Sequence, residues 1–349
     1  MSQSTQYASV LAKIGAERST LLGEVKLKAL TESKDLSAFT SQLRETSYQL
    51  QISKLSLSLS SRKLERAFNE NFIESVEKIA KNSPEKVANY LNLYLLRFEV
   101  ENIKVLVKAT NANLSPEQKI AKLYLSVENY LKHFNFEDAA KASNVKQLLN
   151  SIKITIYASC LNLGLQSYEE TGSTAYIDVL LDKVYYEKLY EGYMSLPKKE
   201  RSRAHFYAST ENDGFTLLTL LRGKNLNYDA NWLRRALPQN NFNLSMSTVD
   251  ELLSASDFES ALKIVLESNY ASFFVKAQSP EEVLSKAEKA FKKSVLQYAK
   301  SNRIVDSFNI GGALAFITQK ESEVHDLIAT SAGIEAAVSP EKIQGQLLL

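Results

Sequence analysis

The chain repeats itself, and this repetition limits the folds that it can adopt. Three 16-residue segments align without a gap: SKDLSAFTSQLRETSY (33–48), ASNVKQLLNSIKITIY (142–157) and ASDFESALKIVLESNY (255–270). Each carries Asp or Asn at its third position, where a side-chain oxygen can cap a helix. Apolar residues follow at helical spacing. Each segment then ends on a hydroxyl residue two positions before a tyrosine. The third-position residues are Asp35, Asn144 and Asp257, the hydroxyl residues are Thr46, Thr155 and Ser268, and the tyrosines are Tyr48, Tyr157 and Tyr270.

Two further patterns recur in the same order. The first is LERAF (64–68), LDKVY (181–185) and AEKAF (287–291). The second is NIKVLVKAT (102–110), TLLTLLRGK (216–224) and, more loosely, EVHDLIATS (323–331). Three patterns in register indicate three related repeats of roughly 110 residues. We expect these repeats to cover residues 1–138, 139–248 and 249–349.

The composition favours an all-α fold. The 349 residues include only 11 glycines and 6 prolines, so long helices with few tight turns are expected. SPEQ (115–118) and SPEK (339–342) predict helix starts with proline at the first helical position. IKITIY (152–157) is β-prone in isolation, but no longer strand signal supports it.

Gly311 and Gly312 stand side by side before an apolar run, and such a pair can cradle a phosphate or allow close packing. A phosphate-binding loop would continue into Lys and Ser or Thr, whereas here the pair runs into ALAF. A dinucleotide-binding fold would need a buried strand before the glycines, and KSNRIVDSF does not provide one. We therefore expect the pair to open a packed helix.

The other candidate sites lack the residue types or the spacing that a metal-binding or catalytic site requires. TENDGF (210–215) resembles a calcium loop, but the first and twelfth ligand positions would be Ser209 and Leu220, so we interpret the stretch as a helix cap. His133, His205 and His325 lie in unrelated contexts, and His325 aligns with Lys104 in the first repeat. The single cysteine, Cys160, has apolar neighbours typical of a buried thiol. The sequence thus predicts no catalytic, cofactor-binding or metal-binding residue, and no cofactor.

Charge is nearly balanced at +2, which argues against nucleic acid as a partner. PKKERSRAHFY (197–207), RGK (222–224) and WLRR (232–235) concentrate basic residues in the second repeat. A solvated helix face explains them adequately, and the alternative is contact with lipid headgroups or an acidic partner protein. No window approaches a membrane-spanning length, and the polar start is not typical of a signal peptide. We expect that the chain can lie on a membrane or on a membrane protein but does not span the bilayer.

Three stretches carry a family resemblance. YASVLAKIGAERSTLL (7–22), followed by LRETSY (43–48), resembles the opening of the C subunit of archaeal-type (A/V-type) rotary ATPases. YLLRFEVENIKVLVKAT (94–110) is similar to the family's repeated helix, and FNIGGALAFITQKESEVHDL (308–327) is similar to its C-terminal signature.

The chain departs from the family pattern in some places. Lys13 and Glu17 stand where the family often has further arginines around Arg18, and Gly312 stands where it often has proline. The glycine-tyrosine opening typical of the eukaryotic relative, the d subunit of vacuolar ATPases, is missing, which favours the archaeal-type branch.

The resemblance implies a funnel of long helices with pseudo-three-fold symmetry around a central cavity. It implies a non-catalytic rotor part that links the central stalk, with its D- and F-type subunits, to the membrane proteolipid ring. Such a spacer transmits torque between ion translocation and ATP synthesis or hydrolysis. It would be a monomer within a hetero-oligomer, peripheral on the cytoplasmic face of a prokaryotic cell membrane.

One residue-level hypothesis is that Glu101, Asp213 and Glu323, acids near the start of the third-pattern helices, face the cavity, against the alternative of solvated outer faces. The competing function is a free-standing helical-repeat scaffold that binds protein or RNA, although common solenoid repeats are far shorter, at about 34 to 47 residues.

Overall fold

The computed structural model describes residues 3–55, 58–124, 135–153, 155–302 and 309–349. Helices make up the regular structure of these residues, and no strand occurs among them, which confirms the all-α prediction. The β-prone stretch at 152–157 holds the end of one helix and a turn in its described part. The described helices form two compact bodies.

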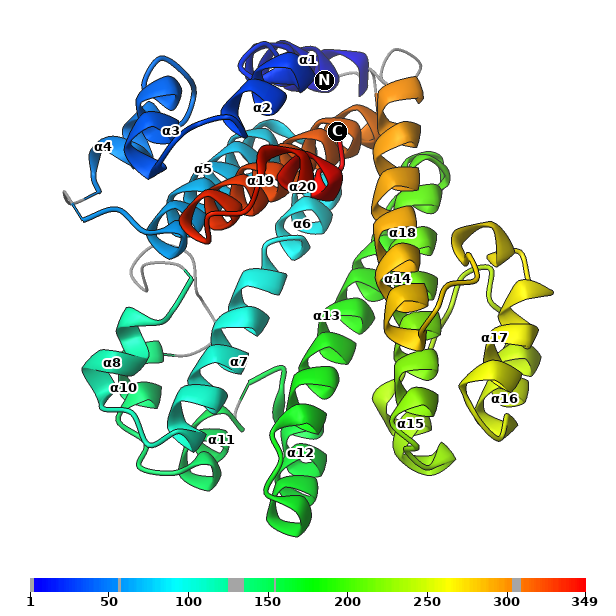
Figure 1. Ribbon diagram of the computed structural model, residues 1–349. Helices are drawn as coiled ribbons and strands as arrows, with labels where there is room; N and C mark the ends of the chain where they lie inside the picture. The colour runs from blue at the N-terminus through cyan, green and yellow to red at the C-terminus, as the bar shows by residue number, and fades with distance from the viewer. Residues whose placement is uncertain (1–2, 56–57, 125–134, 154, 303–308) are drawn as a thin grey trace. The chain divides into compact units, whose positions relative to one another are not determined.

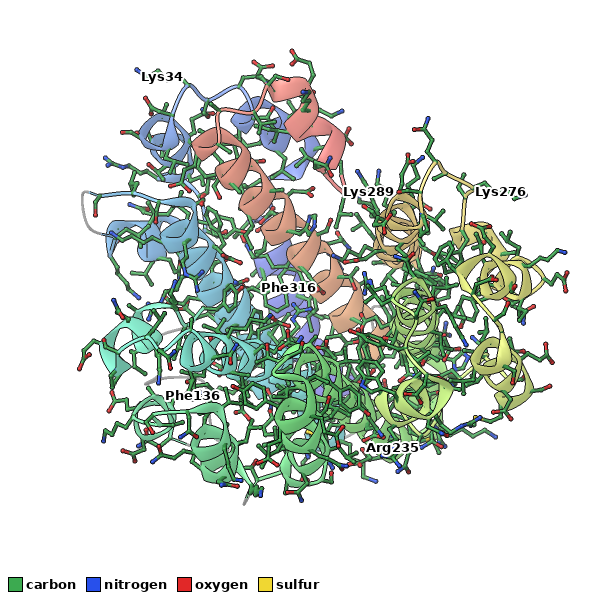
Figure 2. The ribbon with its side chains drawn as sticks, turned by 60° about the horizontal axis from the view of Figure 1, so that its bottom comes forward. Lys34, Phe136, Arg235, Lys276, Lys289 and Phe316 are labelled. Carbon is green, nitrogen blue, oxygen red and sulfur yellow. The ribbon has the colours of Figure 1, made fainter. Side chains whose placement is uncertain are left out.

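Body 1 comprises residues 1–92, 196–204 and 293–349. Its helices are α1 (Gln3–Arg18), α2 (Gly23–Leu30), α3 (Leu36–Leu43), α4 (Gln49–Ser53), α5 (Ser61–Asn82), most of α6 (Glu85–Leu93), α19 (Ile310–Glu335) and α20 (Pro340–Gln346). The central element is α19, which packs along α5 and also contacts α1, α2, α3 and α20 (Figure 1). Phe316 on α19 is fully buried, whereas Lys34 points away from the body (Figure 2).

Body 2 comprises residues 93–195 and 205–292. Its elements are α7 (Leu96–Asn111), α8 (Pro116–Ala121), α10 (Phe136–Ala140), α11 (Val145–Ile152), α12 (Ala158–Thr171), α13 (Ala175–Ser195), most of α14 (Lys198–Asn225), α15 (Ala230–Ala236), α16 (Met246–Ser254), α17 (Phe258–Leu266), the 3-10 turn η1 (Ala271–Phe273) and the first half of α18 (Pro280–Asn302). In this body α13 packs along α7 and α12, and α16 packs on α17 (Figure 1).

The repeated segments fold alike. Asp35, Asn144 and Asp257 are N-caps whose side chains accept from backbone N–H groups three residues on, at 2.8–2.9 Å. These caps begin α3, α11 and α17, as the sequence predicted. The hydroxyls of Thr46, Thr155 and Ser268 donate to carbonyls three residues back and accept from the tyrosine N–H two residues on.

The third-pattern helices α7, α14 and α19 also end alike. Asn113, Asn227 and Ala337 have φ of 55°, 56° and 53°, the left-handed conformation that closes many helices. The following N–H groups, of Leu114, Tyr228 and Val338, donate back to the carbonyls of Ala109, Gly223 and Gly333 at 2.9–3.1 Å. This geometry fixes the register of the three helices at intervals of 114 and 110 residues.

The structural register corrects one alignment. Residues 102–110 correspond to 216–224 and then to 326–334, so the third copy predicted at 323–331 lay three residues too early. His325 therefore corresponds to Glu101 and not to Lys104. A three-residue shift is nearly one helical turn, so the apolar pattern hardly changes and does not reveal the error. The predicted boundaries of the three repeats stay a prediction.

Candidate functional site: three tyrosine–carboxylate joints

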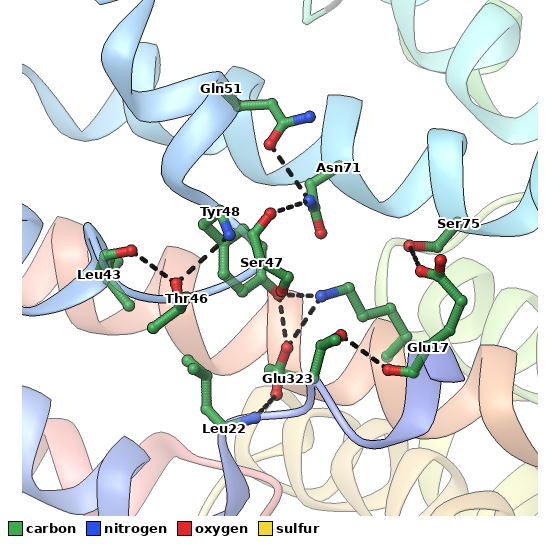
Figure 3. A network of polar contacts seen from close by, with 12 residues as sticks. Glu17, Leu22, Leu43, Thr46, Ser47, Tyr48, Gln51, Asn71, Ser75 and Glu323 are labelled. Carbon is green, nitrogen blue, oxygen red and sulfur yellow. Dashed lines mark hydrogen bonds and ion pairs between the residues drawn. The ribbon is translucent and has the colours of Figure 1, made fainter. Parts of the chain in front are cut away.

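The tyrosine of each repeated segment bonds to a buried carboxylate, and we call each such pair a joint. In the first joint the Tyr48 hydroxyl donates to Glu323 Oε1 at 2.7 Å (Figure 3). The Leu22 N–H donates to the other oxygen, Oε2. Lys320 Nζ lies 2.8 Å from the Tyr48 oxygen and 3.0 Å from Glu323 Oε1. Glu323 is only 4% exposed, so this network lies inside body 1.

The second and third joints lie in body 2. Tyr157 donates to Glu99 Oε1 at 2.8 Å, and Tyr270 donates to Asp213 Oδ2 at 2.6 Å. Asp213 also accepts from three consecutive backbone N–H groups, of Phe242, Asn243 and Leu244, at 2.7–3.0 Å. Leu244 precedes Tyr270 by the same 26 residues that separate Leu22 from Tyr48. The third joint therefore copies the backbone donor of the first.

Each joint connects one repeat to the next. Glu99, Asp213 and Glu323 occupy the same position of α7, α14 and α19. The tyrosine that each acid binds comes from the following segment of the chain, and Glu323 of the last helix binds Tyr48 of the first segment. The hydrogen-bonding pattern thus closes on itself.

In two joints, an aromatic side chain from the second repeated pattern packs against the tyrosine. Phe68 on α5 meets the Tyr48 ring edge-on at 5.4 Å between centroids, and Phe291 on α18 lies 6.0 Å from the Tyr270 ring. Such aromatic contacts hold the phenol in one orientation.

The joints have the electrostatics of structural hydrogen bonds. Burial, and then the neighbouring carboxylate, raise the pKa of Tyr48, Tyr157 and Tyr270 well above the ordinary value, so each phenol stays protonated and donates. Burial lowers the pKa of Lys320, while Glu323 opposes this effect. A protonated phenol on a carboxylate leaves neither group available as a nucleophile or base.

The cavity hypothesis for the three acids is wrong for two of them. Asp213 is 0% exposed and Glu323 4%, and both are occupied by the joints. The third member of their set is Glu99, at 3% exposure, and not Glu101, whose side chain is 46% exposed. Glu101 instead pairs with Lys104 at 2.8 Å, and whether it faces a cavity stays a prediction. Two residues along a helix are about 200° apart, so Glu99 and Glu101 face different ways.

Gly311 and Gly312 lie at the start of α19, as predicted. The N–H groups of this helix start, which could bind an anion, donate instead to side chains of the protein itself. Asn309 is the N-cap and accepts from the Gly311 N–H at 2.8 Å. Glu200, itself 2% exposed, accepts from the Ile310 N–H through Oε2 at 2.7 Å. A carboxylate at a helix N-terminus satisfies the same free N–H groups that would bind phosphate.

The calcium-loop stretch is helical. Residues 210–215 lie in the middle of the 28-residue helix α14, so our interpretation of them as a cap was wrong. Among the described residues no group of three or more His, Cys, Asp or Glu could hold a metal ion. Burial raises the pKa of Cys160 to about 12, which makes it an unreactive thiol.

The histidines do not converge. His205 is bracketed in body 2 by the Tyr193 hydroxyl at 3.0 Å and Asn243 Oδ1 at 3.3 Å. His325 lies in body 1, with Nδ1 3.2 Å from Asp326 Oδ1. His133 lies outside the described residues.

The basic residues of the second repeat do not form one patch. Lys199 belongs to body 1 and Lys224 to body 2, although both lie on α14. Lys224 is buried and donates to the carbonyls of Leu253 and Ala255. Arg222 pairs with Glu288, while Arg235 is exposed on the surface (Figure 2).

Comparison with known proteins decides the family. The family model described as ATP synthase (C/AC39) subunit matches residues 10–346. The chain belongs to this family. Among similar curated proteins, the C subunit of the A-type ATP synthase of Methanocaldococcus jannaschii is 26% identical over 98% of this chain and 86% of its own length. The equivalent subunits of Pyrococcus abyssi (26% identical, 97% and 90% covered) and Methanothermobacter thermautotrophicus (24%, 98% and 87%) match likewise.

The sequence pattern revealed only part of the three joints. The repeated tyrosines were visible in the sequence, and two of the three acids were singled out there. The pairing of each tyrosine with the helix of the preceding repeat was not visible, because the partners of the first joint are 275 residues apart. In the part of the chain that the structure describes, none of the helices combines the length and the apolar character of a membrane-spanning segment.

Proposed function

We propose that this chain is the C subunit of an A-type ATP synthase, a non-catalytic rotor part that joins the central stalk to the membrane proteolipid ring. The observation that carries the proposal is the family match, which runs from residue 10 to residue 346. The relatives named as this subunit of A-type ATP synthases match nearly the same span. No observation on the described residues favours the alternative of a free-standing protein- or RNA-binding scaffold over this match.

The joints support a mechanical role. A torque-bearing spacer must deform little, and packed helices tied by buried hydrogen bonds resist deformation. Each joint ties a third-pattern helix to the next segment, and the last helix returns to the first. Such closure suits three repeats set around one axis, an arrangement that stays part of the proposal.

The same proposal identifies the partner proteins. One end of the protein would receive D- and F-type stalk subunits and the other would sit on the proteolipid ring, at the cytoplasmic face of the membrane. Interfaces that hold under torque should each bury more than about 1,000 Å². Contact with lipid headgroups would be secondary.

Two experiments test the proposal. A tagged chain purified from detergent-treated membranes should bring down stalk subunits and the proteolipid, and recovery without any of them would contradict it. A cross-link between this chain and the ring should leave ATP hydrolysis intact, because both would turn together. A cross-link to a stator protein should stop hydrolysis, and continued hydrolysis with that cross-link formed would reject a rotor role.

A further inference from the structure

Lys320 sets the first joint apart from the other two. The residue three positions before the acid is Leu96 in the second joint and Thr210 in the third, but Lys320 in the first. Lys320 is 2% exposed, and its ammonium lies 4.0 Å over the centre of the Tyr48 ring. Of the three equivalent helices, α19 is thus the one that places a lysine one turn before the joint acid and buries the pair.

The buried ion pair weakens the closed state. Removing an ammonium and a carboxylate from water is costly, and replacing such a buried pair by well-packed apolar groups of similar volume is often neutral or stabilising. The lowered pKa of Lys320 reflects this cost, since burial outweighs the neighbouring Glu323. Leu96 and Thr210 are uncharged, so the second and third joints bury the carboxylate of Glu99 or Asp213 but no ammonium at this position.

Both members of the ion pair lie on the same helix. Lys320 and Glu323 lie one turn apart on α19, so they stay paired when the segment that carries Tyr48 moves away. Once exposed, both charges regain water. Glu323 accepts from two groups outside α19, the Tyr48 hydroxyl and the Leu22 N–H, and keeps Lys320 when they leave. In the third joint, four donors to Asp213 come from other elements: Tyr270 and the backbone of residues 242–244. Opening that joint removes these four partners from the acid.

We propose that the first joint is the opening point of the fold, where α3 and Tyr48 separate from α19 while the other two joints stay closed. The inference does not depend on the proposed function, because it compares three equivalent places in one chain. It describes a local opening that occurs in the native protein.

Amide hydrogen exchange on the full-length protein tests this inference. The helices α3, α11 and α17 have 8, 8 and 9 residues and equivalent caps, so their amides form a matched set. After correction for intrinsic rates, we expect amides of α3 to exchange at least about tenfold faster than those of α11 and α17. Equal protection of the three helices, or faster exchange in α11 or α17, would overturn the proposal.

Two variants test the role of the charge. In Lys320→Leu/Glu323→Gln both charges are absent, while the amide can still accept from Leu22 and donate to the Tyr48 oxygen. We expect exchange in α3 to slow at least about tenfold, with α11 and α17 unchanged. Leu96→Lys places the same charge in the second joint and should speed exchange in α11 alone. Unchanged or faster exchange of α3 in the double variant would show that Lys320 does not govern the opening.

Discussion

The hydroxyl of Tyr270 donates a 2.6 Å hydrogen bond to Oδ2 of Asp213, and both residues are buried in body 2. The same bond occurs between Tyr157 and Glu99 and between Tyr48 and Glu323. A hydrogen bond to a buried charged acceptor stabilises a fold by about 1.5–3 kcal/mol. The joints thus tie the segments of the chain together.

Tyr270→Phe should lower the free energy of unfolding by about 1.5–3 kcal/mol, because Asp213 loses a donor that water cannot replace. Urea unfolding followed by circular dichroism measures this loss. Tyr168→Phe is the matched control, since its hydroxyl bonds to Asn111 at 2.8 Å on the surface, and it should cost less than about 0.5 kcal/mol. Equal losses in the two variants would argue against a structural role of the joint.

Alkaline pH should unfold the protein steeply. The pKa values of the joint tyrosines in the folded state are raised above 10.0, so their stabilising contribution is complete below pH 10 and falls as the pH rises above it. Each tyrosine that ionises only in the unfolded chain adds about 1.4 kcal/mol per pH unit to the slope, and three add about 4 kcal/mol. Urea unfolding between about pH 9 and 12 measures the slope. In Tyr157→Phe it should be about 1.4 kcal/mol per pH unit shallower, and an unchanged slope would count against the raised pKa.

Gly333→Ala should destabilise the protein although alanine favours helices. An added Cβ would stand 2.6 Å from Cγ1 of Ile343 on α20, and overpacking of this kind costs about 1–3 kcal/mol. The helix propensity gained is at most about 1 kcal/mol. Combining Gly333→Ala with Ile343→Ala should cost less than the sum of the two single changes, as measured by thermal unfolding.

Gly15→Ala provides the control for this substitution. It lies in α1, and nothing approaches within 4 Å of an added Cβ, so it should stabilise the protein by about 0.5–1 kcal/mol. A loss of stability at Gly15, or a gain at Gly333, would contradict the packing argument.

Replacing Gly311 or Gly312 by valine should weaken folding or assembly, because both glycines are buried at the start of α19. Glu200→Ala should also destabilise, by about 1–3 kcal/mol, since it leaves the buried Ile310 N–H without an acceptor. Neither change should alter nucleotide binding by this protein alone, which titration calorimetry with ATP can measure. ATP binding by the wild type that Gly312→Val abolishes would restore the phosphate interpretation of the glycine pair.

Local features of this chain were determined by the sequence itself. The caps Asp35, Asn144 and Asp257 act on backbone groups three residues away, so their spacing alone predicted the starts of α3, α11 and α17. The scarcity of glycine and proline predicted long helices, and the glycine pair at 311–312 was correctly placed at a helix start. The sequence also supported the family assignment, because its motifs extend over nearly the whole chain.

Only the tertiary structure decided which groups meet. Helical periodicity hardly distinguishes a shift of three residues, so the third copy was misaligned, and Glu101 was chosen two residues away from the buried Glu99. The burial of Lys320 and the bond from Tyr48 to Glu323 join parts 272 and 275 residues apart. Such contacts depend on how whole helices pack, and no local pattern in the chain encodes them.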